Sequence, residues 1–108
     1  MGQYHLGEFE EVVLLTVAVL NGEAYGMAII EEMEKRLQRE VSIGALQTVL
    51  RRLEDKGLVT SEFGEATRIR GGKRKRYFKL TKEGMLALSE VKNQRMILWK
   101  LIPKKAYN

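Results

Sequence analysis

The sequence contains no cysteine and only one histidine among its 108 residues. Without cysteine, the chain can form no disulfide, no thiolate metal site and no cysteine nucleophile. The single histidine, His5, cannot build a histidine metal cluster and is a poor candidate for the base of a Ser-His-Asp relay. No glycine-rich loop of the kind that cradles phosphates is present. The sequence therefore predicts no metal, no cofactor and no enzymatic activity.

Long apolar runs are also missing. The uninterrupted apolar stretches fall far short of the roughly 20 residues that cross a bilayer. The start of the chain lacks the basic patch and apolar run of a signal peptide. With a single proline and 44% hydrophobic residues, the composition indicates one folded, helix-rich domain. We expect a cytoplasmic protein with no membrane partner.

Charge is distributed unevenly along the chain. Residues 1–66 hold 6 Lys/Arg against 12 Asp/Glu, a balance of −6, whereas residues 67–108 hold 13 against 2, a balance of +11. Positive charge concentrated in one part of the chain favours a polyanionic partner through Coulomb attraction and counterion release. The alternative interpretation is a solvated lysine-rich surface.

Four helices are expected from end signals and apolar spacing. The first begins with an acidic turn at residues 8–11 and ends at Asn21-Gly22. Its apolar stretch leaves no polar face, so part of it is expected to meet a second copy. The second covers residues 25–38, with its apolar side formed by Ile29, Ile30, Met33 and Leu37.

The third begins after an N-cap at Ser42 and ends at Gly57. It carries helically spaced apolar residues, namely Ile43, Leu46, Val49, Leu50 and Leu53. The fourth runs from a cap at Thr81 to Leu101 or Ile102, before Pro103.

Residues 58–66 and 75–81 favour strands on either side of the Gly71-Gly72 pair, which suits a tight turn. Three helices followed by a hairpin describe a winged helix-turn-helix. The predicted fold class is thus mainly α with a small β-hairpin, with a winged helix over residues 1–81 and a long C-terminal dimerisation helix and tail over residues 82–108, forming one compact unit.

In such a fold the third helix enters the major groove of double-stranded DNA. Its exposed polar side offers four candidates for reading base edges, namely Ala45, Gln47, Thr48 and Arg51. Gln47 can pair with adenine, Thr48 can bond a base or touch a thymine methyl, and Arg51 can bond guanine or a phosphate. The alternative is an ordinary amphipathic helix with a solvated face.

The hairpin carries a cluster of cations that suits contacts to the DNA backbone. The cluster consists of Arg68, Arg70, Lys73, Arg74, Lys75, Arg76 and Lys79. These residues would supply affinity more than sequence choice. The alternative is a hairpin tip whose charge only makes the protein soluble.

Several short motifs occur in order between Leu6 and Leu88, namely Leu6-Gly7-Glu8-Phe9-Glu10, Tyr25-Gly26, the stretch from Leu50 to Val59, and the stretch from Gly72 to Gly84. Together they resemble the PadR-like family of bacterial winged-helix transcriptional regulators. The resemblance implies a dimeric, sequence-specific DNA-binding regulator, expected to be a nucleoid-associated repressor. It also implies phosphate contacts for Tyr25, Arg51, Arg52 and the hairpin cations. The family usually has Tyr-Pro where this chain has Gln47-Thr48, so the operator sequence is left open.

The C-terminal helix resembles the single dimerisation helix of the family's short members. With the first helix, it is expected to form a two-fold dimer that binds an inverted repeat. The expected interface consists of Val12, Leu15, Val19, Leu88, Val91, Met96, Leu98, Trp99 and Ile102.

Some short relatives bind flat aromatic compounds through a tryptophan in this helix, so Trp99 and Met96 are candidates for an aromatic effector site. The alternative is that Trp99 only packs in the interface. The competing function is a winged-helix module for RNA or protein contacts.

Overall fold

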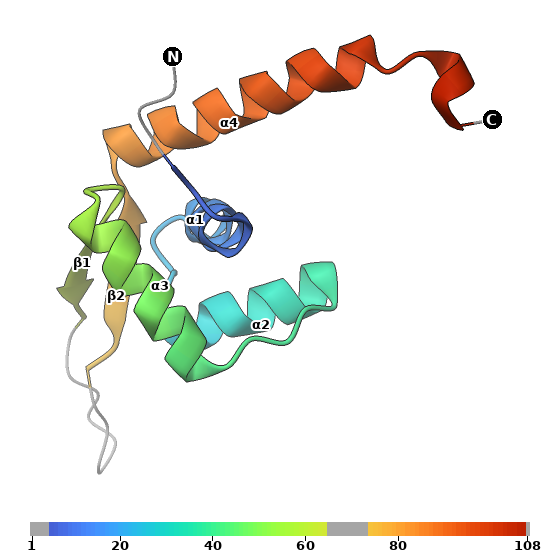
Figure 1. Ribbon diagram of the computed structural model, residues 1–108. Helices are drawn as coiled ribbons and strands as arrows, with labels where there is room; N and C mark the ends of the chain where they lie inside the picture. The colour runs from blue at the N-terminus through green and yellow to red at the C-terminus, as the bar shows by residue number, and fades with distance from the viewer. Residues whose placement is uncertain (1–4, 65–73, 108) are drawn as a thin grey trace.

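The computed structural model describes residues 5–64 and 74–107. Along the described chain the elements are α1 (Glu8–Leu20), α2 (Gly26–Leu37), α3 (Ile43–Asp55), β1 (Val59–Phe63), β2 (Arg76–Leu80), α4 (Lys82–Leu101) and a short 3₁₀ helix, η1 (Lys104–Tyr107). This order confirms the predicted class, mainly helical with one antiparallel hairpin (Figure 1). The 3₁₀ helix after Pro103 was not predicted.

The helix ends follow the signals in the sequence. Ser42 accepts a hydrogen bond from the Ala45 amide (3.1 Å) at the start of α3, and Thr81 accepts one from the Gly84 amide (2.9 Å) at the start of α4. Asn21 and Gly22 adopt φ values of 34° and 97° after α1, and Gly57 adopts 76° after α3. These residues supply the left-handed backbone that stops a helix.

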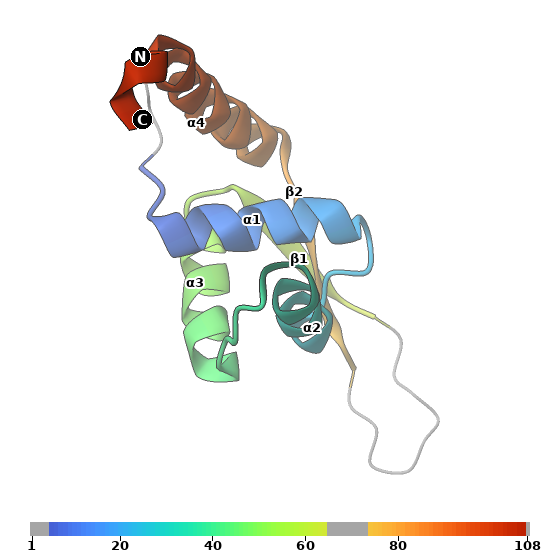
Figure 2. The same ribbon diagram turned by 90° about the vertical axis from the view of Figure 1, so that its right-hand side faces the viewer.

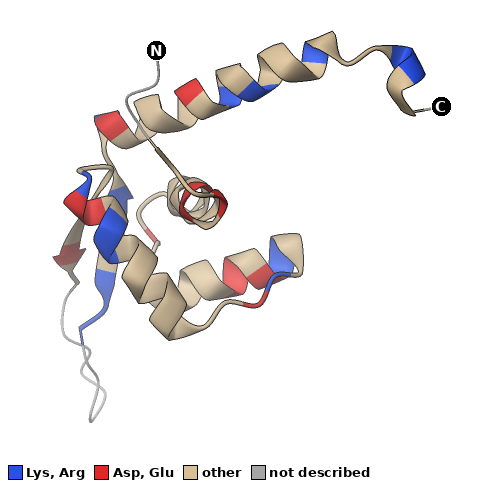
Figure 3. Ribbon diagram, in the orientation of Figure 1, with Lys and Arg blue, Asp and Glu red and all other residues tan. Residues whose placement is uncertain are grey.

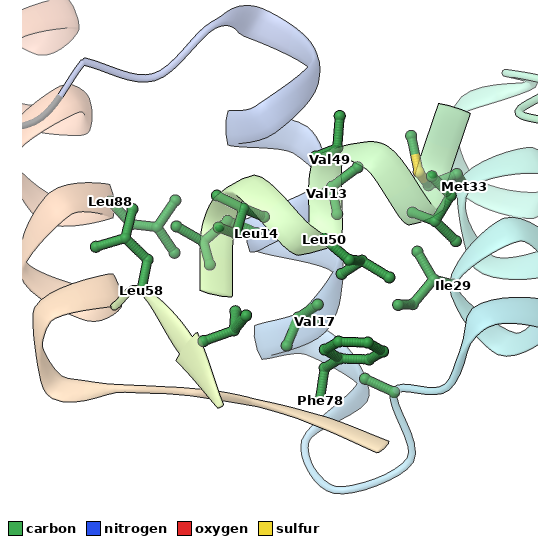
Figure 4. Packing of buried hydrophobic residues seen from close by; sticks show 14 of the residues in the cluster. Val13, Leu14, Val17, Ile29, Met33, Val49, Leu50, Leu58, Phe78 and Leu88 are labelled. Carbon is green, nitrogen blue, oxygen red and sulfur yellow. The ribbon is translucent and has the colours of Figure 1, made fainter. Parts of the chain in front are cut away.

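Helix α1 lies at the centre of the fold, with α4 on one side and α2 and α3 on the other (Figures 1 and 2). Val13, Leu14 and Val17 of α1 are fully or almost fully buried. They meet side chains from every neighbouring element, including Ile29 and Phe78 (Figure 4). The single core therefore forms around α1, and α3 and the hairpin are held against it.

Two expected core positions lie at the surface instead. Leu37 is 51% exposed and Ile43 is 46% exposed, because they are the last residue of α2 and the first of α3 and lie beyond the core. Helix α1 also differs from expectation, since it buries two polar side chains, Glu10 and Thr16. Thr16 is satisfied within its own helix, where its hydroxyl donates to the Val12 carbonyl (2.8 Å).

The hairpin is anchored on the chain that precedes α2. Strands β1 and β2 pair from Val59 opposite Leu80 to Phe63 opposite Arg76. The Phe78 amide donates to the Ala24 carbonyl (2.8 Å), and Tyr25 forms an isolated bridge with Tyr77. Phe78 points into the core between these contacts. A two-stranded hairpin is marginal by itself, so these contacts give it a defined position.

Helix α4 starts in the core and ends in solvent. Near its start Gly84, Ala87 and Leu88 are buried, whereas every residue from Lys92 to Tyr107 is exposed. Leu88 is only 6% exposed, so in the single chain it packs in the core and not on the surface where it was expected to meet a second copy. Within residues 5–64 and 74–107, no helix has the length and apolarity needed to cross a membrane.

Candidate nucleic-acid interface

The exposed side of α3 holds the four residues expected to read bases. Leu46, Val49, Leu50 and Leu53 point into the core, which leaves Ala45, Gln47, Thr48 and Arg51 exposed. The Thr48 hydroxyl donates to the Gly44 carbonyl (3.1 Å). This hydrogen bond leaves Thr48 with an acceptor oxygen and a methyl group to present outward.

A groove of about 730 Å³ runs beside this helix. It lies between the start of α2, the side of α3 and the start of β2. Its lining includes Tyr25, Gly26, Met27, Ile43, Gln47, Leu50, Arg51, Glu54, Arg74, Lys75, Arg76 and Phe78. The groove therefore brings two of the predicted base-reading residues and three of the hairpin cations to one place.

The lining of this groove is strongly positive. Four of its side chains are Lys or Arg and only one, Glu54, is acidic. Lys and Arg mark β2 and part of α3, whereas acidic residues gather on α2 and at the start of α1 (Figure 3). Tyr25, Gly26 and Met27 at the start of α2 line the groove, so the positive end of that helix dipole lies beside it. The arrangement suits a phosphate backbone.

Tyr25 positions one of the cations. The Lys75 ammonium nitrogen lies 4.1 Å from the centre of the Tyr25 ring. The same ring meets Tyr77 edge to face, with 5.5 Å between ring centres. Tyr25 thus holds Lys75 by a cation–π contact, a role that the resemblance did not imply.

Arg76 differs from its neighbours Arg74 and Lys75. Its guanidinium donates to Glu54 of α3 (3.0 Å) and to Ser61 of β1 (2.9 Å). Within the described residues Arg74 and Lys75 form no ion pair. The sequence did not predict the pairing of Glu54 with Arg76, because 22 residues separate them. Only the fold brings α3 and β2 together at this point.

The other predicted cations are placed away from the groove or outside the described ranges. Arg52 is exposed on α3, and its charge acts on Glu10 of α1. Lys79 lines a separate, smaller groove of about 290 Å³ together with Glu23 and Glu62. Arg68, Arg70 and Lys73 lie outside the described residues.

The end of α3 is fixed to α1 by a buried carboxylate. Lys56 donates to both oxygens of Glu10 (2.9 and 3.1 Å) and to the His5 carbonyl (2.9 Å). Glu10 also accepts from the Gly7 amide (2.8 Å), as in a capping box. Burial acts to raise the pKa of Glu10, but the Gly7 amide and the Lys56 ammonium outweigh burial and hold that pKa below its usual value.

The surface expected to meet a second copy carries large apolar side chains. Six of them are between 42% and 67% exposed, namely Leu15, Val19, Met96, Leu98, Trp99 and Ile102. Val12 is half-buried, and Val91 and Leu98 line a shallow groove of about 420 Å³ between α4 and the segment before α1. In the single chain, Trp99 and Met96 line none of the grooves described here.

Comparison with known proteins places this geometry in a family. Residues 14–90 match the model of the transcriptional regulator PadR-like family. A PadR-like transcription factor from Bacteroides fragilis is 30% identical, with a TM-score of 0.71 over 85% of this chain and 84% of that one. A PadR family transcriptional regulator from Eggerthella lenta is 29% identical, with a TM-score of 0.68 over 86% and 80%.

A PadR family regulator from Clostridium difficile, 24% identical, shares the fold with a TM-score of 0.73 over 88% of this chain and 94% of that one. No match is found among curated proteins. The family model covers well over half of the chain, and it includes α2, α3, the hairpin and the buried part of α4. The chain therefore belongs to the PadR-like family of transcriptional regulators.

Proposed function

We propose that the protein binds double-stranded DNA at an inverted repeat as a two-fold dimer and represses transcription from that site. The observation that carries this proposal is the groove in which the polar side of α3 and the cations at the start of β2 face the same space. A helix that reads base edges and a cationic arm that holds phosphates complement each other, because the first provides specificity and the second affinity. Repression is the simplest effect on transcription that such a dimer can have, because a bound dimer excludes other proteins from the same DNA.

Each side chain has a distinct role in this proposal. Gln47 reads adenine, Thr48 offers its methyl group to thymine, and Arg51 bonds guanine or a phosphate. Arg74 and Lys75, the latter held by Tyr25, contact phosphates along the groove. Ala45, which is exposed beside Gln47, allows the helix to approach the bases closely.

The dimer is supported by the exposed apolar side chains of α1 and α4. A single chain leaves Leu98, Trp99 and Leu101 at least 67% exposed on the last turns of α4. Contiguous apolar surface of this kind usually marks a protein interface. A second copy is the partner that the proposal favours, because two copies related by a two-fold axis match the symmetry of an inverted repeat.

The proposal includes an effector site at the centre of this dimer. Trp99 and Met96 would form an apolar slot for a planar aromatic compound. Arg95 pairs with Glu11 of α1 (2.7 Å). Lys92, which is exposed one helical turn before Met96, would favour an anionic ligand. Titration with aromatic acids, followed by tryptophan fluorescence and DNA release, tests the site; saturable quenching without DNA release would leave Trp99 with a packing role only.

Selection of bound fragments from genomic DNA, followed by footprinting, tests the function. We expect a symmetric footprint whose half-sites are about 10 base pairs apart, one turn of the double helix. Q47A and T48V should change the preferred sequence, whereas R74Q should weaken binding to all sequences alike. An asymmetric footprint, or tighter binding to RNA than to the selected duplex, would favour the competing function in RNA or protein contacts.

A further inference from the structure

We propose that Glu54, Ser61 and Arg76 form a clasp that fixes the base of the hairpin against α3. Glu54 and Arg76 are then positioning residues for DNA binding and do not contact DNA themselves. This inference rests on the proposed DNA-binding function. It also reverses the role that the sequence predicts for Arg76, which is a direct contact with a phosphate.

The clasp is a closed ring of hydrogen bonds between three elements. Arg76 of β2 donates to Glu54 of α3 (3.0 Å) and to the Ser61 hydroxyl of β1 (2.9 Å). The Ser61 hydroxyl in turn donates to the other oxygen of Glu54 (2.7 Å). Both carboxylate oxygens and the hydroxyl are thereby used, so the three side chains fix one another's orientation.

Two aromatic rings hold the guanidinium from the sides. The central carbon of the Arg76 guanidinium lies 5.7 Å from the centre of the Phe63 ring and 5.6 Å from that of Phe78. Phe78 belongs to the buried core, so Arg76 is attached to a rigid part of the molecule. The side chains of Arg76 and Glu54 are 49% and 33% exposed, which leaves the pair only partly in water.

The position of the clasp explains what it can control. Arg51, which lines the groove, lies one helical turn before Glu54 on α3. Arg74 and Lys75 directly precede Arg76 at the start of β2. The clasp therefore sets the separation between the residues that read bases and the cations that hold phosphates. Because Glu54 already compensates the charge of Arg76, that charge contributes little to counterion release.

The clasp and a direct phosphate contact predict opposite effects for E54Q. If Arg76 bound a phosphate, removal of the Glu54 charge would free Arg76 and strengthen DNA binding. If the clasp positions the hairpin, E54Q loosens the hairpin and weakens binding. The E54Q/R76Q double variant gives a second contrast. It keeps the net charge, so the salt dependence of its binding should fall only if Arg76 contacts a phosphate.

The experiment measures the dissociation constant for the selected duplex over a range of salt concentrations. The proteins compared are the wild type, E54Q, R76Q, the E54Q/R76Q double variant, S61A and the matched control R74Q. We expect E54Q and R76Q each to weaken binding by about three- to tenfold, the loss typical of a partly exposed charged hydrogen bond. The double variant should bind the duplex no more weakly than the single variant that has the higher dissociation constant, because both changes break the same ring.

The salt slope separates positioning from contact. R74Q should lower the slope of log K against log salt by about 1, whereas the E54Q/R76Q double variant, which keeps the net charge, should leave it unchanged. S61A, which alters no charge, should weaken binding by a smaller factor. If circular dichroism shows that a charge variant is unfolded, S61A decides the outcome. Equal or tighter binding by E54Q, or a slope for the double variant that falls like that of R74Q, would overturn the clasp. A wild type that binds no duplex would instead refute DNA binding, and the clasp with it.

Discussion

At the scale of single residues, two glycines in helices have opposite surroundings. A Cβ atom added to Gly84 would overlap the Leu58 carbonyl oxygen, because the start of α4 packs directly on the chain between α3 and β1. The Thr81 amide and hydroxyl donate to the neighbouring carbonyls of Leu58 (3.1 Å) and Gly57 (2.7 Å). The same Cβ added to Gly44 of α3 would meet nothing within 4 Å.

This difference predicts opposite changes in stability. G84A should lower the free energy of unfolding by about 2 to 4 kcal/mol, because backbone atoms at the contact must move apart. G44A should raise it by up to about 1 kcal/mol, since alanine favours a helix and has open space at that position. Urea unfolding followed by circular dichroism measures both values. Equal effects of the two substitutions would show that α4 does not pack on Leu58 as described.

At the scale of elements, three acids in the first turn of α1 hold three different parts of the fold. Glu8 pairs with Arg39 after α2 (2.7 Å), Glu10 with Lys56 after α3 (2.9 Å), and Glu11 with Arg95 of α4 (2.7 Å). The hydrogen bonds from Arg39 lower the pKa of Glu8. The start of α1 is thus the point through which α3 and α4 are connected.

The lowered pKa values of Glu8 and Glu10 make stability depend on acid pH. A carboxylate whose pKa is lower in the folded state stabilises that state fully above its unfolded pKa, and the contribution is lost as pH falls through the folded pKa. We therefore expect the free energy of unfolding to decrease once the pH is lowered below about 4.5, which is the ordinary pKa of these groups.

The substitution E10Q tests the contribution of the buried acid. At pH 7, E10Q should cost about 1 to 2 kcal/mol, because Lys56 loses a charged partner. Towards acid pH the wild type and E10Q should converge, since protonation of Glu10 breaks the same pair. E31Q, which removes an exposed charge on α2, is the control and should keep a constant difference from the wild type. A constant difference for E10Q as well would contradict the role given to this ion pair.

At the scale of the whole molecule, the chain is elongated. It measures 61 × 30 × 21 Å and has a radius of gyration of 16.4 Å, against about 13 Å for a compact domain of this length. The length comes from the second half of α4, which projects from the core (Figure 1). The core does not cover this part of the helix, so its large apolar side chains lie exposed.

The proposed dimer predicts a mass of two chains in solution. Light scattering at micromolar concentration should give about twice the mass of 12.4 kDa for one chain. The double variant L98E/W99E should give the monomer mass, because charges at the centre of an apolar interface remain unpaired. M85E changes a 52% exposed residue on the first turns of α4 and is the matched control. A wild type that scatters as a monomer would rule out this dimer.

The sequence by itself determined the elements and their order, because the signals that start and stop them are local. Ser42 and Thr81 act within one helical turn, and Asn21 and Gly57 adopt the left-handed backbone where they stand. The apolar spacing of α3 likewise left only one side free, so the exposure of Gln47 and Arg51 followed from the sequence. The family resemblance also rested on short, ordered motifs, and the family model confirmed it.

Only the tertiary structure decided which charges act on which. Arg74 and Arg76 look equivalent in the sequence, yet Arg76 alone meets Glu54, because α3 and β2 are brought together by a core that no local pattern encodes. Leu88 and Leu98 are both apolar residues of α4, but the first packs against α1 and the second lies beyond the core. Local interactions fix where a helix begins and ends, whereas burial and ion pairing depend on residues distant in the chain.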